Sequence, residues 1–156
     1  MIYVFDTNSL SELNAYYPDI FKEFWNKFDG VVSSGQVIST REVFPEIERS
    51  GLEHIVTWAK GNKAIFFTMP TATETAFVAQ IFAVPHFRSL IGAKQQQRGD
   101  PVADPFVIAC AKINGGTVVT EEKLKPNAAK IPNVCDHFNI PWTNLAGFMR
   151  AQRWSF

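Results

Sequence analysis

The sequence predicts an α/β fold with a central, mostly parallel sheet. Short apolar runs alternate with segments of helical period along the chain, which is typical of parallel strands joined by right-handed helical crossovers. The chain has 156 residues, of which 46% are hydrophobic, and no internal repeat or low-complexity linker divides it. Because this length can fill one core but not two, we expect a single domain over residues 1–156.

The first predicted strand is the run IYVF, residues 2–5, whose continuous apolar character is typical of a strand covered on both faces. It leads directly into the polar residues DTN, which begin at Asp6. Ser9 and Glu12 match a capping box, which predicts a helix that begins at Ser9. Asp6 is therefore expected at the mouth of the core.

Helices and strands continue to alternate after Pro18. A helix is predicted there from apolar residues that recur at helical spacing and should pack in the core, namely Ile20, Phe21, Phe24, Trp25 and Phe28. The run QVIST, residues 36–40, predicts a strand, and Pro45 should kink the following helix or delay its start. Residues 52–60 predict another helix, and the run AIFFT, residues 64–68, predicts a strand.

In the second half of the chain, Thr71 and Glu74 form a capping box before an alanine-rich helix that Pro85 ends. Residues 86–100 are more polar and predict a helix that decays into a mobile loop. The segment DPVADPFVIACAKINGG predicts a helix with a Gly-Gly turn after it, and TVVT, residues 117–120, predicts a buried strand. A short helix, a short strand and a terminal helix are expected to complete the fold.

Composition limits the classes of function. The 15 basic and 15 acidic residues give zero net charge, so a nucleic-acid partner would need a local basic patch. Cys110 and Cys135 lack the spacing of a zinc site or a disulfide framework and are expected to be reduced packing residues. No apolar run is long enough to span a bilayer and no secretory signal is evident, so we expect a soluble cytoplasmic protein with no membrane partner.

Acidic residues gather at one edge of the predicted sheet, where open α/β folds bind their ligands. They are Asp6 after the first strand, Glu42 and Glu46 after the second, Asp104 at the start of a helix, and Glu121 and Glu122 after the last buried strand. Two carboxylates about 4 Å apart repel by roughly 4 kcal/mol at an effective dielectric near 20, so such a group needs protons or a cation. All-oxygen ligands favour Mg²⁺ or Mn²⁺, which suits phosphodiester hydrolysis.

Each acid also has a simpler structural interpretation. Asp104 precedes a proline and can be a helix N-cap, whereas Glu42 can be a solvated helix charge. Glu121 or Glu122 can be a turn residue. Asp6 is the hardest to explain without a function, and the chemical interpretation depends on the combination.

Four motifs, VFDTN, VxxEI at Val43 to Ile47, ADPFVIACAK and VVTEE, occur in the order of a PIN domain and together resemble that family from Ile2 to about Glu122. The resemblance implies a three-layer α/β/α fold whose acidic pocket binds Mg²⁺ or Mn²⁺ and cleaves RNA, as in VapC-like toxins of prokaryotic toxin–antitoxin modules. It also implies an antitoxin protein that covers the acidic pocket.

Carried over to this sequence, the resemblance assigns the catalytic and metal-binding roles to Asp6, Glu46, Asp104 and Glu122. Glu42 stays open as an alternative to Glu46, because Pro45 leaves the helical register undecided. Thr120 matches the threonine of the last motif. The family usually has aspartate where this chain has Glu122, and this departure keeps Glu121 open as an alternative.

The remaining candidates are supporting residues. Thr7 is expected to donate to a neighbouring carboxylate, and Asn8 either orients an acid or a bound water or only stabilises a turn. Four basic residues flank the expected mouth and either contact phosphates or serve solubility, namely Lys94, Arg98, Lys123 and Lys125. Two alternative functions stay open: a PIN-like scaffold that binds RNA or protein with weak turnover, and a DNA-directed nuclease of the same fold. The aromatic-rich first helices also suggest a homodimer.

Overall fold

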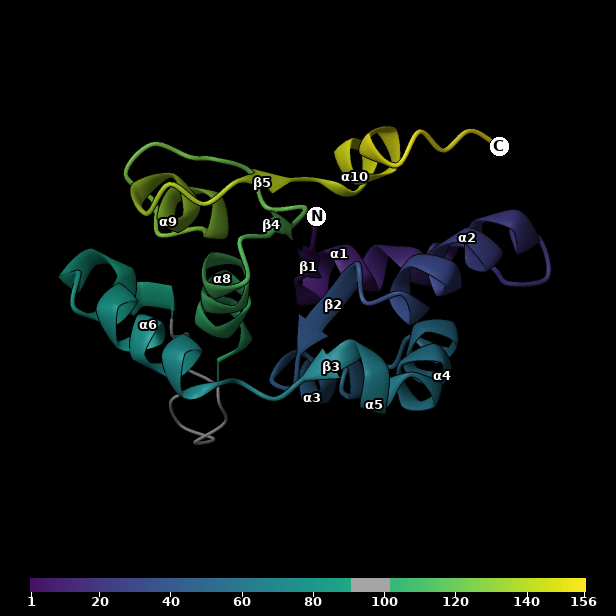
Figure 1. Cartoon of the computed structure of the whole chain (residues 1–156), viewed down its shortest axis with the longest axis horizontal. Coiled ribbons are helices and arrows are strands. Elements are labelled where there is room, and N and C mark those ends of the chain that lie inside the picture. Colours follow the sequence, from purple (N-terminus) through teal and green to yellow (C-terminus); the bar gives the residue numbers. More distant parts are fainter. Residues whose placement is uncertain (91–101) are drawn as a thin grey trace.

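The computed structural model describes residues 1–90 and 102–156 and confirms the predicted α/β fold with a parallel sheet (Figure 1). Five strands lie in the order β3-β2-β1-β4-β5, and each neighbouring pair is parallel. The strands are β1 (Tyr3–Phe5), β2 (Val37–Thr40), β3 (Phe67–Thr68), β4 (Thr117–Val119) and β5 (Trp142–Thr143). The amino-terminal strand therefore lies at the centre of the sheet.

Helices cover both faces of this sheet and make three layers. Figure 1 shows α6 (Ala72–Phe82), α8 (Ala103–Ile113) and α9 (Ile131–His137) on one side. On the other side lie α1 (Thr7–Glu12), α2 (Lys22–Ser33), α4 (Glu53–Gly61) and α5 (Lys63–Phe66). The described residues also form α3 (Val43–Glu48), α10 (Leu145–Ala151) and the 3₁₀ helices η1 (Leu13–Ala15) and η2 (Pro85–Leu90).

The centre of the core is aromatic. Phe5 of β1 packs edge-to-face against Phe28 of α2 and Phe148 of α10, with ring centroids 5.6 and 5.2 Å apart. All three rings are fully buried, and buried aromatic pairs of this geometry add to the stabilisation that apolar burial provides. The packing fixes β1, and with it the position of the residue that follows the strand.

The predicted aromatic stripe of α2 is only partly correct. Phe24, Trp25 and Phe28 are buried, as expected. Ile20 and Phe21 are exposed, because α2 begins only at Lys22 and both residues lie in the turn before it.

Two predicted boundaries are wrong. The side chain of Asp6, not that of Ser9, caps α1, so this helix begins before the expected capping box. Residues 64–68 are mostly helical, because the amide of Phe66 donates to the carbonyl of Asn62 at 2.9 Å and continues a helical turn. Only the two residues of β3 pair with β2.

Other predicted signals agree with the structure. The hydroxyl of Thr71 accepts the amide of Glu74 at 3.1 Å and caps α6, and η2 begins at Pro85 after that helix. The expectation for Pro45 is wrong: α3 runs from Val43 to Glu48 with Pro45 in its first turn, where a missing N–H leaves no helical hydrogen bond unmade. Within the described residues, no helix has both the length and the apolar character needed to cross a membrane.

Candidate functional site

Asp6 and Thr120 meet at the carboxyl edge of the two central strands. The register pairs Phe5 with Val119, so the residues that follow β1 and β4 are neighbours. The hydroxyl of Thr120 donates to Oδ2 of Asp6 at 2.5 Å, and Oδ1 of Asp6 accepts the amide of Ser9 at 2.8 Å. Both carboxylate oxygens are thus held, and the side chain cannot rotate freely.

Burial changes the acidity of this carboxylate. Asp6 is only 1% exposed, and desolvation raises its pKa from 3.8 to about 6. The hydrogen bonds from Thr120 and Ser9 oppose this rise, whereas the nearby charge of Glu122 adds to it. The same Thr120 hydroxyl that donates to Asp6 accepts the amide of Glu122, which connects the two acidic residues.

Glu46 reaches the same region from α3. Its Oε1 accepts the hydroxyl of Thr7 at 2.9 Å, which ties the first turn of α1 to α3. Burial raises its pKa, while the bond from Thr7, the amide of Ala103 and the charge of Arg49 lower it. Its Oε2 is buried and has no hydrogen-bond partner within the described residues.

Asp104 lies in the first turn of α8 and lines a cavity together with Glu122. The N-cap residue of this helix is Val102, so Asp104 is not the cap that its position before a proline suggested. Burial, followed by the charges of Glu122, Asp6 and Glu46, raises its pKa from 3.8 to about 8. Four carboxylates from four parts of the chain therefore interact electrostatically at this edge.

Glu122 is anchored at the start of α9. Its Oε2 accepts the amide of Ile131 at 3.0 Å, and its own amide donates to the hydroxyl of Thr120 at 3.1 Å. Glu122 and Asp104 line an open cavity of about 260 Å³, together with Ser89, Leu90, Ala129 and Lys130. A small hydrated ion or a phosphate group can enter a space of this size.

The two alternatives that the sequence left open lie elsewhere. Glu42 contacts Arg41, with its Oε1 3.3 Å from the guanidinium Nε, and its charge raises the pKa of Cys110 rather than that of Asp104. Glu121 accepts the amide of Leu145 at 2.7 Å and so holds the start of α10. The structure thus places Glu46 and Glu122, and not their alternatives, beside Asp104.

The expected supporting residues are distributed unequally. Thr7 and Thr120 hold carboxylates, whereas Asn8 is exposed on the first turn of α1. Lys123 and Lys125 are exposed. Lys94, Arg98 and Asp100 lie outside the described residues. Cys110 and Cys135 are free and buried, and desolvation raises the pKa of both thiols, which agrees with their expected role as packing residues.

Lys130 is a site residue that the sequence did not reveal. It lines the cavity with Asp104, and its charge lowers the pKa of that carboxyl, opposing the effects of burial and of the other acids. It precedes α9, and no spacing or motif connects it with the amino-terminal acids. Only the fold brings this ammonium to the mouth of the site.

The donor set suits a hard divalent cation, although it is not preformed. No group of three Asp, Glu, His or Cys side chains among residues 1–90 and 102–156 is arranged to hold a metal ion. The converging donors are nevertheless all carboxylate oxygens, and the buried Oε2 of Glu46 has no other partner in this part of the chain. This chemistry fits Mg²⁺ or Mn²⁺.

Comparisons with known proteins identify one family and similar solved structures. A family profile described as "Domain of unknown function (DUF4411)" matches residues 3–156, and no curated protein matches the sequence. The crystal structure of VapBC2 from Rickettsia felis bound to a DNA fragment from their promoter is similar, with a TM-score of 0.53 and 15% identity over 92% of this chain and 98% of that one. PAE2754 from Pyrobaculum aerophilum gives a TM-score of 0.41 and 14% identity over 89% and 97%. The fold is the PIN-like α/β/α fold that the sequence motifs resemble.

Proposed function

The chain belongs to the DUF4411 family, whose description states no activity, and from the chemistry of its acidic site we propose that it is an Mg²⁺- or Mn²⁺-dependent endoribonuclease. The proposed reaction is hydrolysis of RNA phosphodiester bonds. The PIN-like fold supports a nuclease in general, and the acidic residues support the metal-dependent form of that chemistry.

One observation carries this proposal, namely the environment of Asp104. Its pKa rises to about 8 because it is buried beside Asp6, Glu46 and Glu122. Such an arrangement costs folding free energy while the acids are ionised, and a divalent cation would offset that cost. Perturbed carboxylates grouped beside a cavity are also typical of functional sites.

In the proposed reaction, Asp6, Glu46, Asp104 and Glu122 would hold the ion. When bound, a divalent cation polarises a phosphoryl oxygen and lowers the pKa of a bound water. The chain's own residues position the ligands: Thr120 fixes Asp6, Thr7 fixes Glu46, and the amide of Ile131 fixes Glu122. Lys130 lies at the cavity, where its ammonium can pair with a phosphate of the RNA.

A toxin role in a two-gene module is the proposed setting, with an antitoxin protein that covers the acidic cavity. Support comes from the resemblance of the sequence motifs and from the structural likeness to VapBC2. The proposed location is the cytoplasm. A homodimer is a further proposal, since Tyr17, Ile20 and Phe21 expose apolar surface between η1 and α2.

A catalytically weak scaffold is a second candidate, because the described acids are not yet arranged as a metal group. Titration of the protein with Mn²⁺ separates the two functions. Binding that Asp104→Asn abolishes supports the enzyme, whereas a wild type that binds no Mn²⁺ supports the scaffold.

The direct test is cleavage of labelled single-stranded RNAs, transfer RNAs and DNA in the presence of Mg²⁺ or Mn²⁺. We expect wild type to cleave RNA, and Asp104→Asn or added EDTA to abolish the cleavage. Asp19→Asn is the matched control, because Asp19 is an exposed aspartate that does not line the acidic cavity. Cleavage that survives in Asp104→Asn would contradict the proposed site, and preferential cleavage of DNA would favour a DNA-directed nuclease.

A further inference from the structure

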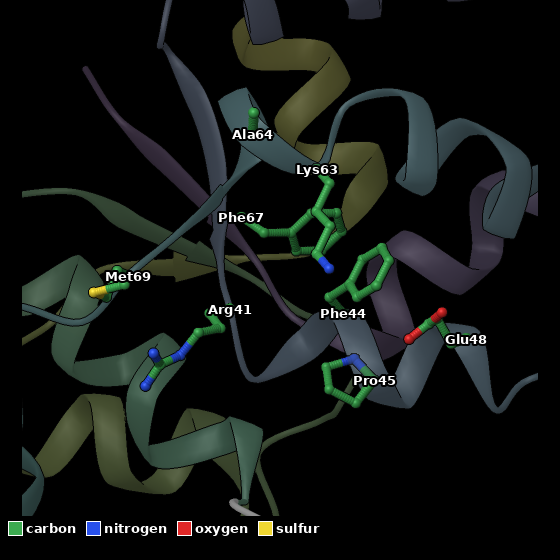
Figure 2. Close-up of a pocket in the computed structure, with 8 residues that line it drawn as sticks. All are labelled: Arg41, Phe44, Pro45, Glu48, Lys63, Ala64, Phe67 and Met69. Carbon is green, nitrogen blue, oxygen red and sulfur yellow. The ribbon is translucent and has the colours of Figure 1, made fainter.

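Residues of α3 and α5 line a second cavity, of about 560 Å³ (Figure 2). Arg41, which follows β2, and Met69, which follows β3, border it, just as Asp6 and Thr120 follow β1 and β4. Its volume falls within the range of about 300–1,000 Å³ that is typical of small-molecule sites. The nuclease proposal leaves this cavity without a role.

The lining combines aromatic rings with cations. Phe44 and Phe67 pack edge-to-face, with ring centroids 5.2 Å apart, and form an apolar wall. Figure 2 shows the ammonium of Lys63 turned toward Phe44, and its Nζ lies 4.5 Å from the centroid of that ring. The side chain of Arg41 is 61% exposed, so its guanidinium is accessible from solvent.

This cavity and the acidic site share one helix. In α3, Phe44 and Glu48 are four residues apart and lie on one face, whereas Glu46 is about half a turn away and bonds to Thr7. A polymer chain that reaches the acids across α3 would therefore meet the aromatic cavity on the other side of the helix. The cavity is therefore placed where an extended substrate bound at the acidic site could make a second contact.

We propose that this cavity binds one unpaired nucleotide of single-stranded RNA, with the base against Phe44 and Phe67 and the phosphate beside Lys63 and Arg41. An apolar aromatic wall suits a base, and cations on the same lining suit an anion. Glu48 lies on the other side of Phe44 from Arg41 in Figure 2, so the phosphate is expected at the Arg41 end. The proposal that the ligand is RNA rests on the proposed function. Binding of a nucleotide in this cavity, in contrast, does not require that the protein cleaves RNA.

The test measures binding without turnover. A fluorescently labelled six-nucleotide RNA is titrated with protein in EDTA, and fluorescence anisotropy gives the affinity at several salt concentrations. Three variants are compared with wild type: Lys63→Gln, which removes a cation, Ala64→Trp, which fills the cavity, and Lys22→Gln, an exposed lysine on α2 that does not line the cavity. Lys63 and Ala64 are exposed, so these changes leave the core intact.

We expect Ala64→Trp to weaken binding about tenfold, which is the usual size of one lost base contact. Lys63→Gln should reduce the slope of log affinity against log salt by about 0.7, the value for one phosphate contact on a single strand. Lys22→Gln should change neither quantity. An RNA in which abasic sites replace the bases should bind wild type and Ala64→Trp equally.

Equal affinity of wild type and Ala64→Trp for the intact RNA overturns the proposal. Failure of the nuclease proposal has a different signature, because it is absence of cleavage in Mn²⁺ and does not alter the measurement in EDTA. Thermal unfolding of each variant, followed by circular dichroism, verifies that weaker binding does not reflect loss of the fold.

Discussion

Replacement of Asp104 by asparagine should stabilise the metal-free protein, and the stabilisation should depend on pH. The pKa of Asp104 is about 8 in the folded protein and 3.8 ordinarily, a difference of about 4 units. At about 1.4 kcal/mol per unit, the ionised carboxylate costs the folded state at most about 6 kcal/mol above pH 8. Because structural relaxation and water entry reduce the cost of buried charge, we expect about 2–4 kcal/mol at pH 8.5.

The sign follows from proton binding. Between pH 4 and pH 8 the folded protein retains the proton on Asp104, whereas the unfolded chain has lost it, so the free energy of unfolding falls as pH rises through this window. In Asp104→Asn, the free energy of unfolding should not show this decrease, because asparagine does not ionise. Its advantage over wild type should therefore be small below pH 4 and reach its full size above pH 8.

Urea unfolding followed by circular dichroism, in EDTA at pH 5, 7 and 8.5, measures this difference. Asp19→Asn serves as the control, and its stability should follow that of wild type at every pH. A constant difference across the three pH values, or a less stable Asp104→Asn, would refute the electrostatic reasoning. Addition of Mn²⁺ should stabilise wild type more than the variant.

Three further predictions concern residues that hold the site or the core. Thr120→Val should destabilise the protein by about 1–3 kcal/mol, since it removes the hydrogen bond to Oδ2 of buried Asp6, and Thr120→Ser should restore most of the loss in urea unfolding. Thr7→Val should lower kcat for RNA cleavage about tenfold with KM little changed, because Glu46 loses its orienting bond; an unchanged kcat would remove Thr7 from the proposed mechanism. Phe148→Ala should cost about 3–5 kcal/mol in the same unfolding assay, because the ring is fully buried in the aromatic core, and a loss below 1 kcal/mol would contradict this packing.

The sheet and its acidic edge could be predicted because the signals are local. The two central strands, β1 and β4, are buried and consist mainly of apolar residues. Asp6 directly follows β1, and Thr120 directly follows β4. Because parallel strands have their carboxyl ends at the same edge of a sheet, residues that follow these strands in the sequence are expected to lie close together. This rule places Asp6, whereas the placement of Asp104 also needs its position at the start of α8, the helix that leads into β4.

The register of α3 and the role of Lys130 could not be predicted in this way. The choice between Glu42 and Glu46 depends on where α3 begins, because Glu42 is its N-cap and contacts Arg41, whereas Glu46 lies inside the helix and accepts the hydroxyl of Thr7. Lys130 reaches Asp104 only through the path of the chain after β4. Ser9 misled the prediction of α1 because Asp6 provides the cap three residues earlier.

The contrast between Asp6 and Asp104 also bears on how activity is judged in related sequences. Asp6 caps α1 and anchors Thr120, so a relative that has lost activity would still need it to fold. For Asp104, no hydrogen bond within the described residues offsets the rise in pKa, and its ionised form weakens the folded state. Drift should therefore remove Asp104 soon after selection for activity ends, which makes this residue a marker of an active member and Asp6 a marker of the fold alone.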